Sequence, residues 1–271
     1  MLRRSKLFLA DRTDNSVFYG AYQKPLMIFM VSVFLMIGLN PGPAFSGDWR
    51  VTPIRLDLGK DTKSGVITLT NEAQGKLNVQ MKAMEWSQDA DGKDQYIDTS
   101  DIIFFPKIMT VEKNEDRIIR VGIKIPAVAK EKTYRLFVEE IPEPRKSEGA
   151  SVAIAINFGV PIFVKPVKEE EKAEIAKIEL KKDVLSTVVK NTGNVHFRIN
   201  AVSIKGKNGK GEETFKTELG GWYLLNGAVR TYTASLPKEA CGKTAKMEVE
   251  VKTDNFSLNG RLDVDKAMCS P

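Results

Sequence analysis

A long alternation of apolar and small or polar residues runs from residue 152 to residue 164, within the stretch ASVAIAINFGVPIFVK. A period of two is typical of a β-strand, because successive side chains point to opposite faces of a sheet. Strands commonly have about five or six residues, whereas this pattern continues for thirteen. The apolar row consists of Val152, Ile154, Ile156, Phe158, Val160, Ile162 and Val164. This row exceeds what the inner face of one sandwich strand needs for its own core.

The chain after residue 46 also favours β structure. It is rich in Val, Ile and Thr, long helical patterns are scarce, and short strand-like runs are separated by turn signals. The first series of expected strands comprises 49–58, 65–71, 77–87, 101–111, 116–124, 132–142 and 150–165. The second series comprises 177–183, 184–191, 195–206, 214–219, 228–236, 246–254 and 256–265. About seven strands in each series is typical of an immunoglobulin-like sandwich. The sequence therefore predicts an all-β protein with two immunoglobulin-like β-sandwich domains in tandem, at 47–166 and 167–271.

The N-terminal segment, residues 1–46, is predicted to be a signal peptide that is removed after export. Basic residues precede an apolar run of fourteen residues at 26–39, and Ala44-Phe45-Ser46 places small residues where a signal peptidase cleaves. A membrane anchor is the alternative. As a helix, however, the run would be about 21 Å long, which is shorter than the roughly 30 Å of bilayer hydrocarbon. We therefore expect export rather than anchoring, and no membrane insertion of the remaining chain.

The charge of the chain gives little support to a nucleic-acid partner. The formal net charge is +6, and the leader at 1–46 accounts for half of it. No block of basic residues interleaved with aromatic residues occurs in the sequence. Such blocks are typical of nucleic-acid binding, so this class of partner is not expected.

The two cysteines, Cys241 and Cys269, are expected to form one disulfide. An even number of cysteines in an exported chain favours this pairing. The bond would tie the loop before the penultimate expected strand to the C-terminus. The spacing does not fit the Cys-x-x-Cys motif of redox proteins, so we interpret the bond as structural.

The sequence offers no constellation of residues that would support catalysis. His196 is the single histidine, and no Cys, Asp or Glu stands at metal-ligand spacing from it, so we interpret it as a surface or strand-end residue. The run DADGKD at 89–94 resembles the start of a calcium loop. It lacks the distal Glu and stands where a hairpin turn is needed. We therefore expect a protein that is not an enzyme and that uses no metal or cofactor.

The long strand at 150–165 has two interpretations. It is either a core strand that bends between the domains, or an edge strand that pairs with another protein and fills the core of that protein. Proteins normally protect an edge that combines unpaired N–H and C=O groups with an apolar row, because such an edge promotes association. The pattern alone leaves both interpretations open.

Four segments occur in a recognisable order, namely VTPIRLDL (51–58), YRLFVEEIPEP (134–144), VAIAINFGVPIFVKP (152–166) and NTGNVHFRI (191–199). Together with the predicted signal peptide, this series resembles the periplasmic pilus or fimbrial assembly chaperones, the PapD-like family of the chaperone–usher pathway. The resemblance covers most of the chain after residue 46 and is strongest from 50 to 166. It implies two immunoglobulin-like domains set at an angle with a cleft between them. It also implies that no cofactor is used and that secreted subunits lacking their own last strand are captured.

The resemblance implies roles for particular residues. Donor-strand complementation would insert Val152, Ile154, Ile156 and Phe158 into the subunit, and Val160, Ile162 and Val164 would serve the chaperone's own core. Arg55 matches the arginine that binds the subunit's C-terminal carboxylate in this family. Pro161 stands where a partner lysine is expected. The anchor is then Arg55 alone, or Arg55 with a different basic residue.

Three further residues, Glu140, Lys165 and Asp254, match positions that form an interdomain charge network in the family. Without the resemblance they would be interpreted as solvated surface charges, which contribute little to stability individually.

The leading interpretation is a periplasmic chaperone that binds pilus, fimbrial or coat-like subunits, protects them from aggregation and delivers them to an outer-membrane usher. The alternative is a secreted two-domain structural or adhesive protein in which the long strand is ordinary core. An exposed apolar edge would also allow self-association of the free chaperone.

Overall fold

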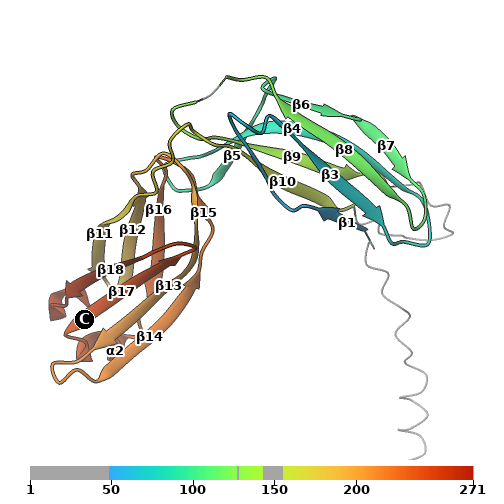
Figure 1. The fold of residues 1–271 in the computed structure, drawn as a ribbon. Coiled ribbons are helices and arrows are strands. Elements are labelled where there is room, and N and C mark those ends of the chain that lie inside the picture. Colours follow the sequence, from blue (N-terminus) through green and yellow to red (C-terminus); the bar gives the residue numbers. More distant parts are fainter. Residues whose placement is uncertain (1–48, 127, 143–154, 271) are drawn as a thin grey trace, which may run out of the picture. The chain divides into compact units, whose positions relative to one another are not determined.

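The computed structural model describes residues 49–126, 128–142 and 155–270 (Figure 1). β-strands dominate these ranges, and the helical elements are the short α2 (Lys238–Lys243) and the 3₁₀ helix η1 (Lys266–Met268). Within the described ranges, neither helix has the length and hydrophobicity that a membrane span requires. The strands form two sandwiches, each with its own apolar core. The expectation of an all-β fold with two tandem sandwiches is confirmed.

The first sandwich contains strands β1 to β10. One sheet has the order β1 (Trp49–Thr52), β3 (Ser64–Asn71), β8 (Asp116–Ile123) and β6 (Ile102–Phe105). The other has the order β2 (Leu56–Leu58), β10 (Asn157–Val164), β9 (Lys132–Glu140), β4 (Leu77–Gln88) and β5 (Asp94–Asp98), and β7 (Ile108–Val111) also pairs with β4. Apolar side chains from both sheets form one core.

The second sandwich contains strands β11 to β18. One sheet has the order β11 (Ala173–Lys181), β12 (Val184–Asn191) and β16 (Val229–Ser235). The other has the order β14 (Glu213–Gly220), β13 (Phe197–Lys207), β17 (Lys246–Thr253) and β18 (Ser257–Asp263), and β15 (Tyr223–Leu224) pairs with β13. Its core is separate from that of the first sandwich.

The alternating sequence determines which face of each strand is buried. In β4, Leu77, Val79 and Met81 are buried, whereas Gln80 and Lys82 on the alternate positions are exposed. Burying one large apolar side chain stabilises the fold by about 1.5–3 kcal/mol relative to leaving it exposed. A period of two places all of these side chains on one face of a strand, and this is why such segments form sheets that pack face to face.

Two expected strands are divided between the sheets at prolines. The expected strand at 49–58 becomes β1 and β2, which lie in different sheets on either side of Pro53. The expected strand at 101–111 is broken at Pro106, as predicted, and β6 is the edge strand of its sheet. Proline has no backbone N–H for a ladder hydrogen bond, so the chain leaves one sheet at each of these positions. β5 was not predicted.

The DADGKD run forms the turn between β4 and β5, as predicted. The Asp89 carboxylate accepts hydrogen bonds from the backbone N–H groups of Asp91 and Lys93, each at 2.9 Å. Gly92 has a φ of +76°, a left-handed conformation that glycine adopts without steric cost. These carboxylate hydrogen bonds lower the pKa of Asp89 below its ordinary value, that from Lys93 most strongly.

Cys241 and Cys269 form a disulfide that joins α2 to the residue after η1, with Cα atoms 5.8 Å apart. The bond therefore ties the segment before β17, the penultimate strand, to the C-terminal end of the chain, as predicted. Cys241 is buried in the second core.

Replacing both cysteines with serine is expected to lower the free energy of unfolding by about 2–4 kcal/mol, because the disulfide restricts the unfolded chain. The cysteines are 28 residues apart in sequence. Urea denaturation checks this value, and wild type in reductant should match the variant. A variant as stable as the oxidised wild type would show that the bond contributes nothing to stability.

A charged hydrogen-bond group links the start of β9 to the residue directly before β6 in the first sandwich. The hydroxyl of Tyr134, fully buried in β9, donates to Asp101 Oδ2 at 2.7 Å, and Lys132 Nζ donates to the same oxygen at 2.9 Å. The hydrogen bond from Tyr134, and then that from Lys132, lowers the pKa of the Asp101 carboxyl below its ordinary value. Burial, together with the bond to Asp101, raises the pKa of Tyr134.

We expect Asp101→Asn to lower the free energy of unfolding by about 1–3 kcal/mol at neutral pH, because Tyr134 loses a charged acceptor. Since the folded-state pKa of Asp101 is lowered, its contribution is complete above the unfolded-state pKa and is lost as the pH falls through the folded-state value. Urea denaturation at neutral pH and at about pH 2–3 should show the difference between the two proteins disappearing in acid. Asp98→Asn, at a largely exposed carboxylate, is the control and should change the free energy of unfolding little. An equal loss for both variants would contradict the stabilising role of Asp101.

Candidate functional site: the open edge of β10

One edge of β10 is only partly paired within the described residues. On one side, β10 pairs with β9 over its whole length, from Asn157 opposite Glu139 to Val164 opposite Lys132. On the other side, β2 pairs in parallel only with Ile162 to Val164. No described strand pairs with residues 157–161 on that side, because β1 belongs to the other sheet. We call residues 157–161 the open edge. Its backbone groups are available to a strand from another chain.

The apolar row of β10 divides near Val160. Val160, Ile162 and Val164 are buried in the first core, which confirms the prediction that they serve the chain's own core. Phe158 is 38% exposed and contacts Trp49 of β1 edge to face, with ring centroids 4.7 Å apart. Ile156 is half-buried and packs against the first core.

The four predicted donor residues are therefore not equivalent. Ile156 already contacts the chain's own core, so its side chain serves two surfaces. Phe158 is the most exposed large apolar side chain on β10. Val152 and Ile154 lie outside the described residues. Their insertion into a subunit remains a prediction from the sequence.

A second, small apolar cluster lies on the opposite face of β10. Phe163 is fully buried and packs with Trp86 of β4 and Leu225 of the second sandwich. The His196 ring stacks on Phe163 with ring centroids 3.5 Å apart. This end of β10 is thus buried on both faces, which the alternation did not predict. The apolar row lies at even-numbered positions, and the large apolar Phe163 at an odd-numbered position was the one sequence signal that the second face is also buried.

Arg55 lies directly before β2, where the open edge ends. Leu56 pairs with Ile162, so Arg55 is adjacent to Pro161. Arg55 Nε lies 3.0 Å from Asp57 Oδ2, and both side chains remain accessible. Arg55 lies beside the open edge, its role as the anchor stays a prediction, and its ion pair with Asp57 was not predicted.

The charge network expected between Glu140, Lys165 and Asp254 is not formed among the described residues. Lys165 Nζ instead pairs with Glu169 at 3.3 Å, a carboxylate four residues along the chain. Glu140 Oε2 accepts a hydrogen bond from the backbone N–H of Ile156 at 3.2 Å. Lys165 thus has its partner in its own segment, and Glu140 has its partner directly before β10 in the same sandwich. Glu140 therefore fixes the start of β10 rather than the junction between the sandwiches.

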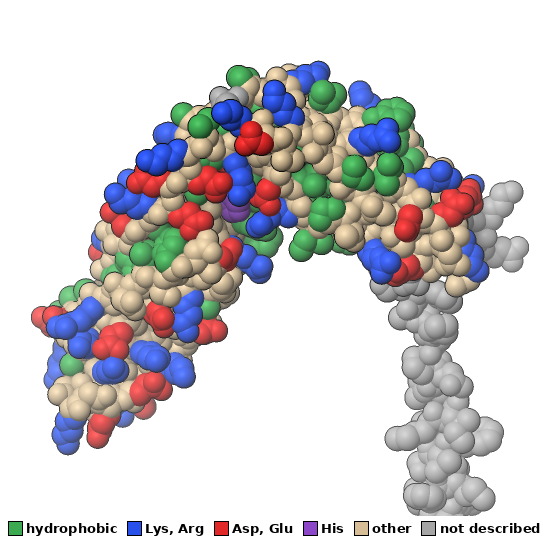
Figure 2. All heavy atoms as spheres, viewed as in Figure 1, with side chains coloured by type: hydrophobic (Ala, Val, Ile, Leu, Met, Phe, Trp, Pro, Cys, Tyr) green, Lys and Arg blue, Asp and Glu red, His purple; other side chains and the backbone are tan. Residues whose placement is uncertain are grey.

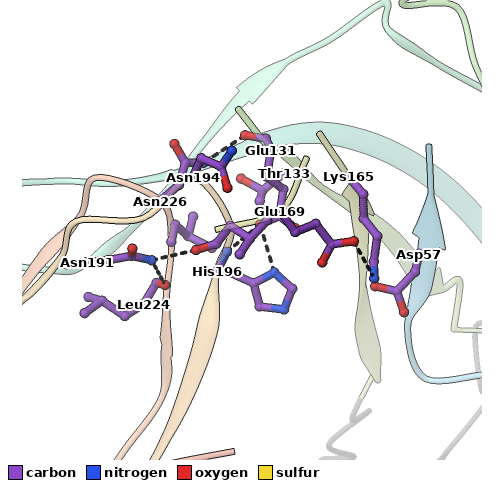
Figure 3. Close-up of polar contacts among 12 residues, drawn as sticks. Asp57, Glu131, Thr133, Lys165, Glu169, Asn191, Asn194, His196, Leu224 and Asn226 are labelled. Carbon is purple, nitrogen blue, oxygen red and sulfur yellow. Dashed lines mark hydrogen bonds and ion pairs between the residues drawn. The ribbon is translucent and has the colours of Figure 1, made fainter. Parts of the chain in front are cut away.

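Polar contacts between the sandwiches centre on Glu131 (Figure 3). This buried carboxylate accepts the backbone N–H of His196 at 2.8 Å, and its Oε2 also lies 2.8 Å from His196 Nδ1. Asn226 Nδ2 donates to the carbonyl oxygen of Glu131 at 2.8 Å. His196 stands at the start of β13, as predicted for a strand-end residue, but it belongs to the junction rather than to the open surface. The sequence interpretation missed Glu131 and Asn226.

Positive and negative side chains are mixed on the described surface. Figure 2 shows Lys and Arg side chains interspersed with Asp and Glu over the visible face of the molecule. Among the described residues, the group with metal-ligand geometry is Asp183 with Cys241 and Cys269, and the two cysteines are joined to each other.

Comparison with known protein families gives a match over the first sandwich. Residues 49–169 match the family described as pili and flagellar-assembly chaperone, PapD N-terminal domain. The chaperone protein FanE of Escherichia coli is 27% identical over 146 residues, which are 52% of this chain and 61% of FanE. The alignment thus spans less than two thirds of FanE.

Solved structures share the fold over most of the chain. One is a chain of the CsuC–CsuE chaperone–tip adhesion subunit pre-assembly complex from the archaic chaperone-usher Csu pili of Acinetobacter baumannii. It superposes with a TM-score of 0.54 and 19% identity, over 79% of this chain and 97% of that chain. The YadV chaperone has a TM-score of 0.54 and 15% identity, over 80% of this chain and 100% of that chain. At these identities the similarity establishes the fold.

Proposed function

We propose that the chain is a periplasmic chaperone of the PapD-like family that binds secreted pilus subunits by strand addition, because residues 49–169 match the N-terminal domain of that family and the FanE chaperone is similar in sequence. A subunit that lacks its last strand has an apolar groove between its sheets. The chaperone places β10 in that groove, prevents aggregation of the subunit, and delivers it to an outer-membrane usher. This process needs no cofactor and no covalent step.

The single observation that carries the proposal is the open edge of β10. Residues 157–161 pair with β9 on one side and with no described strand on the other. An incoming strand gains main-chain hydrogen bonds along such an edge, and pockets for alternate side chains supply specificity. Proteins usually cover or interrupt edges of this kind, so an edge that no described strand covers, beside the exposed Phe158, favours a binding role.

The apolar row supplies the side chains for this exchange. From Val160 onward the row belongs to the chaperone's own core, which holds β10 rigidly in the sheet. Before Val160 the row continues through Phe158 and Ile156 to Ile154 and Val152. These four residues would occupy the groove of the subunit, and Ile156 would exchange part of its contact with the chaperone core for contact with the subunit.

Arg55 is proposed to bind the C-terminal carboxylate of the captured subunit. Its guanidinium is accessible at the end of the open edge. A guanidinium can hold a carboxylate through two parallel hydrogen bonds. The pairing with Asp57 orients the side chain, and the incoming carboxylate would share the guanidinium with Asp57.

The proposed function requires export, for which the predicted signal peptide at 1–46 would serve. This segment lies outside the described residues. The disulfide between Cys241 and Cys269 suits an oxidising compartment such as the periplasm.

Co-expression with a candidate subunit tests the proposal. The candidate is a small secreted β protein encoded beside this chain. We expect a soluble complex of one chaperone and one subunit, measured by size-exclusion chromatography with light scattering, and aggregation of the subunit when expressed alone. A subunit that folds without the chaperone and forms no complex would contradict the proposal. That result would favour the alternative of a secreted structural or adhesive protein.

A further inference from the structure

The strand β14 lies at an edge of the second sandwich. It is the outermost strand in the order β14, β13, β17 and β18, and it pairs with β13 on one side (Figure 1). No strand among the described residues pairs with its other side. The ladder is irregular at Thr214, so the regular part of the strand runs from Phe215 to Gly220. We call this part the β14 edge. A strand in this position has backbone N–H and C=O groups without a ladder partner.

The other edge strands of this sandwich are interrupted or covered. β11 has a register shift between Ile175 and Lys177, and such irregularities protect an edge from pairing. β18 packs against β11, because a Cβ atom at Gly260 would meet side chains of that strand. At the start of β16, the carbonyl oxygen of Val229 lies next to Gly92 in the turn between β4 and β5. No described strand and no register shift interrupts the β14 edge in this way.

The charges on the β14 edge are not balanced within one copy of the chain. Lys216 stands directly opposite Lys205 of β13, and like charges in directly opposite positions destabilise a sheet. Glu248 of β17 is opposite Lys205 on its other side, but this carboxylate pairs with Lys207 at 2.7 Å. Among the described residues, neither Lys205 nor Lys216 forms an ion pair. A negative group on the free side of β14 would therefore be favourable next to Lys216.

A second copy of the same edge supplies this negative group. If two β14 edges pair antiparallel about a two-fold axis at Thr217, Lys216 of each copy stands opposite Glu218 of the other. The same register places Phe215 opposite Leu219 on the inner face. Both apolar side chains are half-buried at the border of the second core, so the pairing would cover apolar surface that they still expose. Two-fold symmetry makes each of these contacts occur twice.

The neighbouring registers are unfavourable because of the same charges. A two-fold axis at Glu218 gives a ladder of equal length, but it places the two copies of this carboxylate opposite each other. An axis at Lys216 shortens the regular ladder and places two ammonium groups opposite each other. Like charges in such positions destabilise the pair. The sequence of the β14 edge therefore selects the register centred on Thr217.

We infer that the chain forms a homodimer by antiparallel pairing of two β14 edges, with Thr217 at the two-fold axis. This inference goes beyond the proposed function and does not depend on it. The contact uses no residue of β10, so each copy keeps its open edge for a subunit. A single strand pair buries less surface than an obligate dimer interface. We therefore expect a reversible dimer with a Kd of about 10–100 μM.

Sedimentation velocity of the protein purified from the periplasm tests the dimer, at concentrations from about 1 to 500 μM. Wild type should change from monomer to dimer within this range. Lys216→Glu should raise the Kd by about 10-fold or more, because two carboxylates would then face each other. Its folding should not suffer, since the new carboxylate stands opposite Lys205. Lys130→Glu, at an exposed lysine before β9, is the matched control and should keep the wild-type Kd.

An exchange of charges tests the register. Glu218→Lys alone should weaken the dimer as Lys216→Glu does. The two substitutions together restore opposite charges at both positions, so the double variant should dimerise with a Kd close to that of wild type. An equimolar mixture of the two single variants should also dimerise, because each copy then supplies the charge that the other lacks. A mixture that stays monomeric would contradict the register.

Two further results would overturn the inference. The first is a wild-type protein that stays monomeric over the whole concentration range. The second is a dimer that Lys216→Glu leaves unchanged, which would place self-association on another surface. Phe158→Asp identifies that surface, because pairing through the open edge of β10 would be lost in this variant, whereas pairing through β14 would persist. Circular dichroism confirms that every variant is folded.

Discussion

Replacing Phe158 with aspartate is expected to abolish the complex with a subunit while the chaperone itself stays folded. Phe158 is 38% exposed on the open edge, so the new carboxylate stays hydrated in the free protein. In the complex it would be buried in the apolar groove of the subunit without a partner. Such burial costs several kcal/mol, so we expect binding to weaken by about 100-fold or more. Size-exclusion chromatography of the co-expressed pair measures the loss.

Phe105→Asp is the matched control for this experiment. Phe105 is 74% exposed on β6 of the other sheet, so the same change of side chain occurs away from the open edge. We expect this variant to retain the complex. If Phe158→Asp also retained the complex, or if the two variants lost it equally, β10 would not be the strand that is donated.

Replacing Phe163 with alanine is expected to lower the free energy of unfolding by about 3–5 kcal/mol. Phe163 has no exposed surface and fills the cluster with Trp86 and Leu225. Its ring also supports His196, whose backbone and ring contact the buried Glu131. A cavity at this point would remove apolar contacts from both sandwiches at once. Urea denaturation gives the loss, and near-ultraviolet circular dichroism reports the surroundings of Trp86.

The control for Phe163→Ala lies on the same strand. Phe158→Ala removes the same atoms from a partly exposed position that faces the other side of β10. We expect it to cost no more than about 1.5 kcal/mol, since less apolar surface is lost from the interior. Equal losses for the two variants would mean that the cluster around Phe163 contributes nothing beyond ordinary surface packing.

Alternation in the sequence was sufficient to predict the sandwiches, and the resemblance to the PapD-like family supplied the division of the apolar row. Val160, Ile162 and Val164 are buried where the pattern placed them, because a period of two gives one face of a strand to the core. The division of the first expected strand at Pro53 was harder to predict. A proline indicates an interruption, but the sheet in which each half finds its partner depends on contacts with residues far along the chain.

The polar groups around β10 could not be derived from local sequence for the same reason. Glu131 and His196 contact each other from 65 residues apart. The Arg135 guanidinium of β9 lies over the rings of Trp86 and Trp222 and 3.8 Å from Asp94, which come from three different segments. Spacing rules describe neighbours on one helix or strand and carry no information about contacts between residues of different segments. The expected pairing of Lys165 failed because Glu169 stands within reach in its own segment.

The parallel pairing of β2 with β10 has a consequence for the order of folding. Leu56 and Ile162 form a ladder pair although nearly the whole first sandwich lies between them in sequence. Contacts of large sequence separation form slowly, because the intervening chain must first be brought together. In the proposed export, the first sandwich cannot close until its final strand has emerged. The strand that we propose to be donated to subunits is therefore also the strand whose arrival completes the first sandwich.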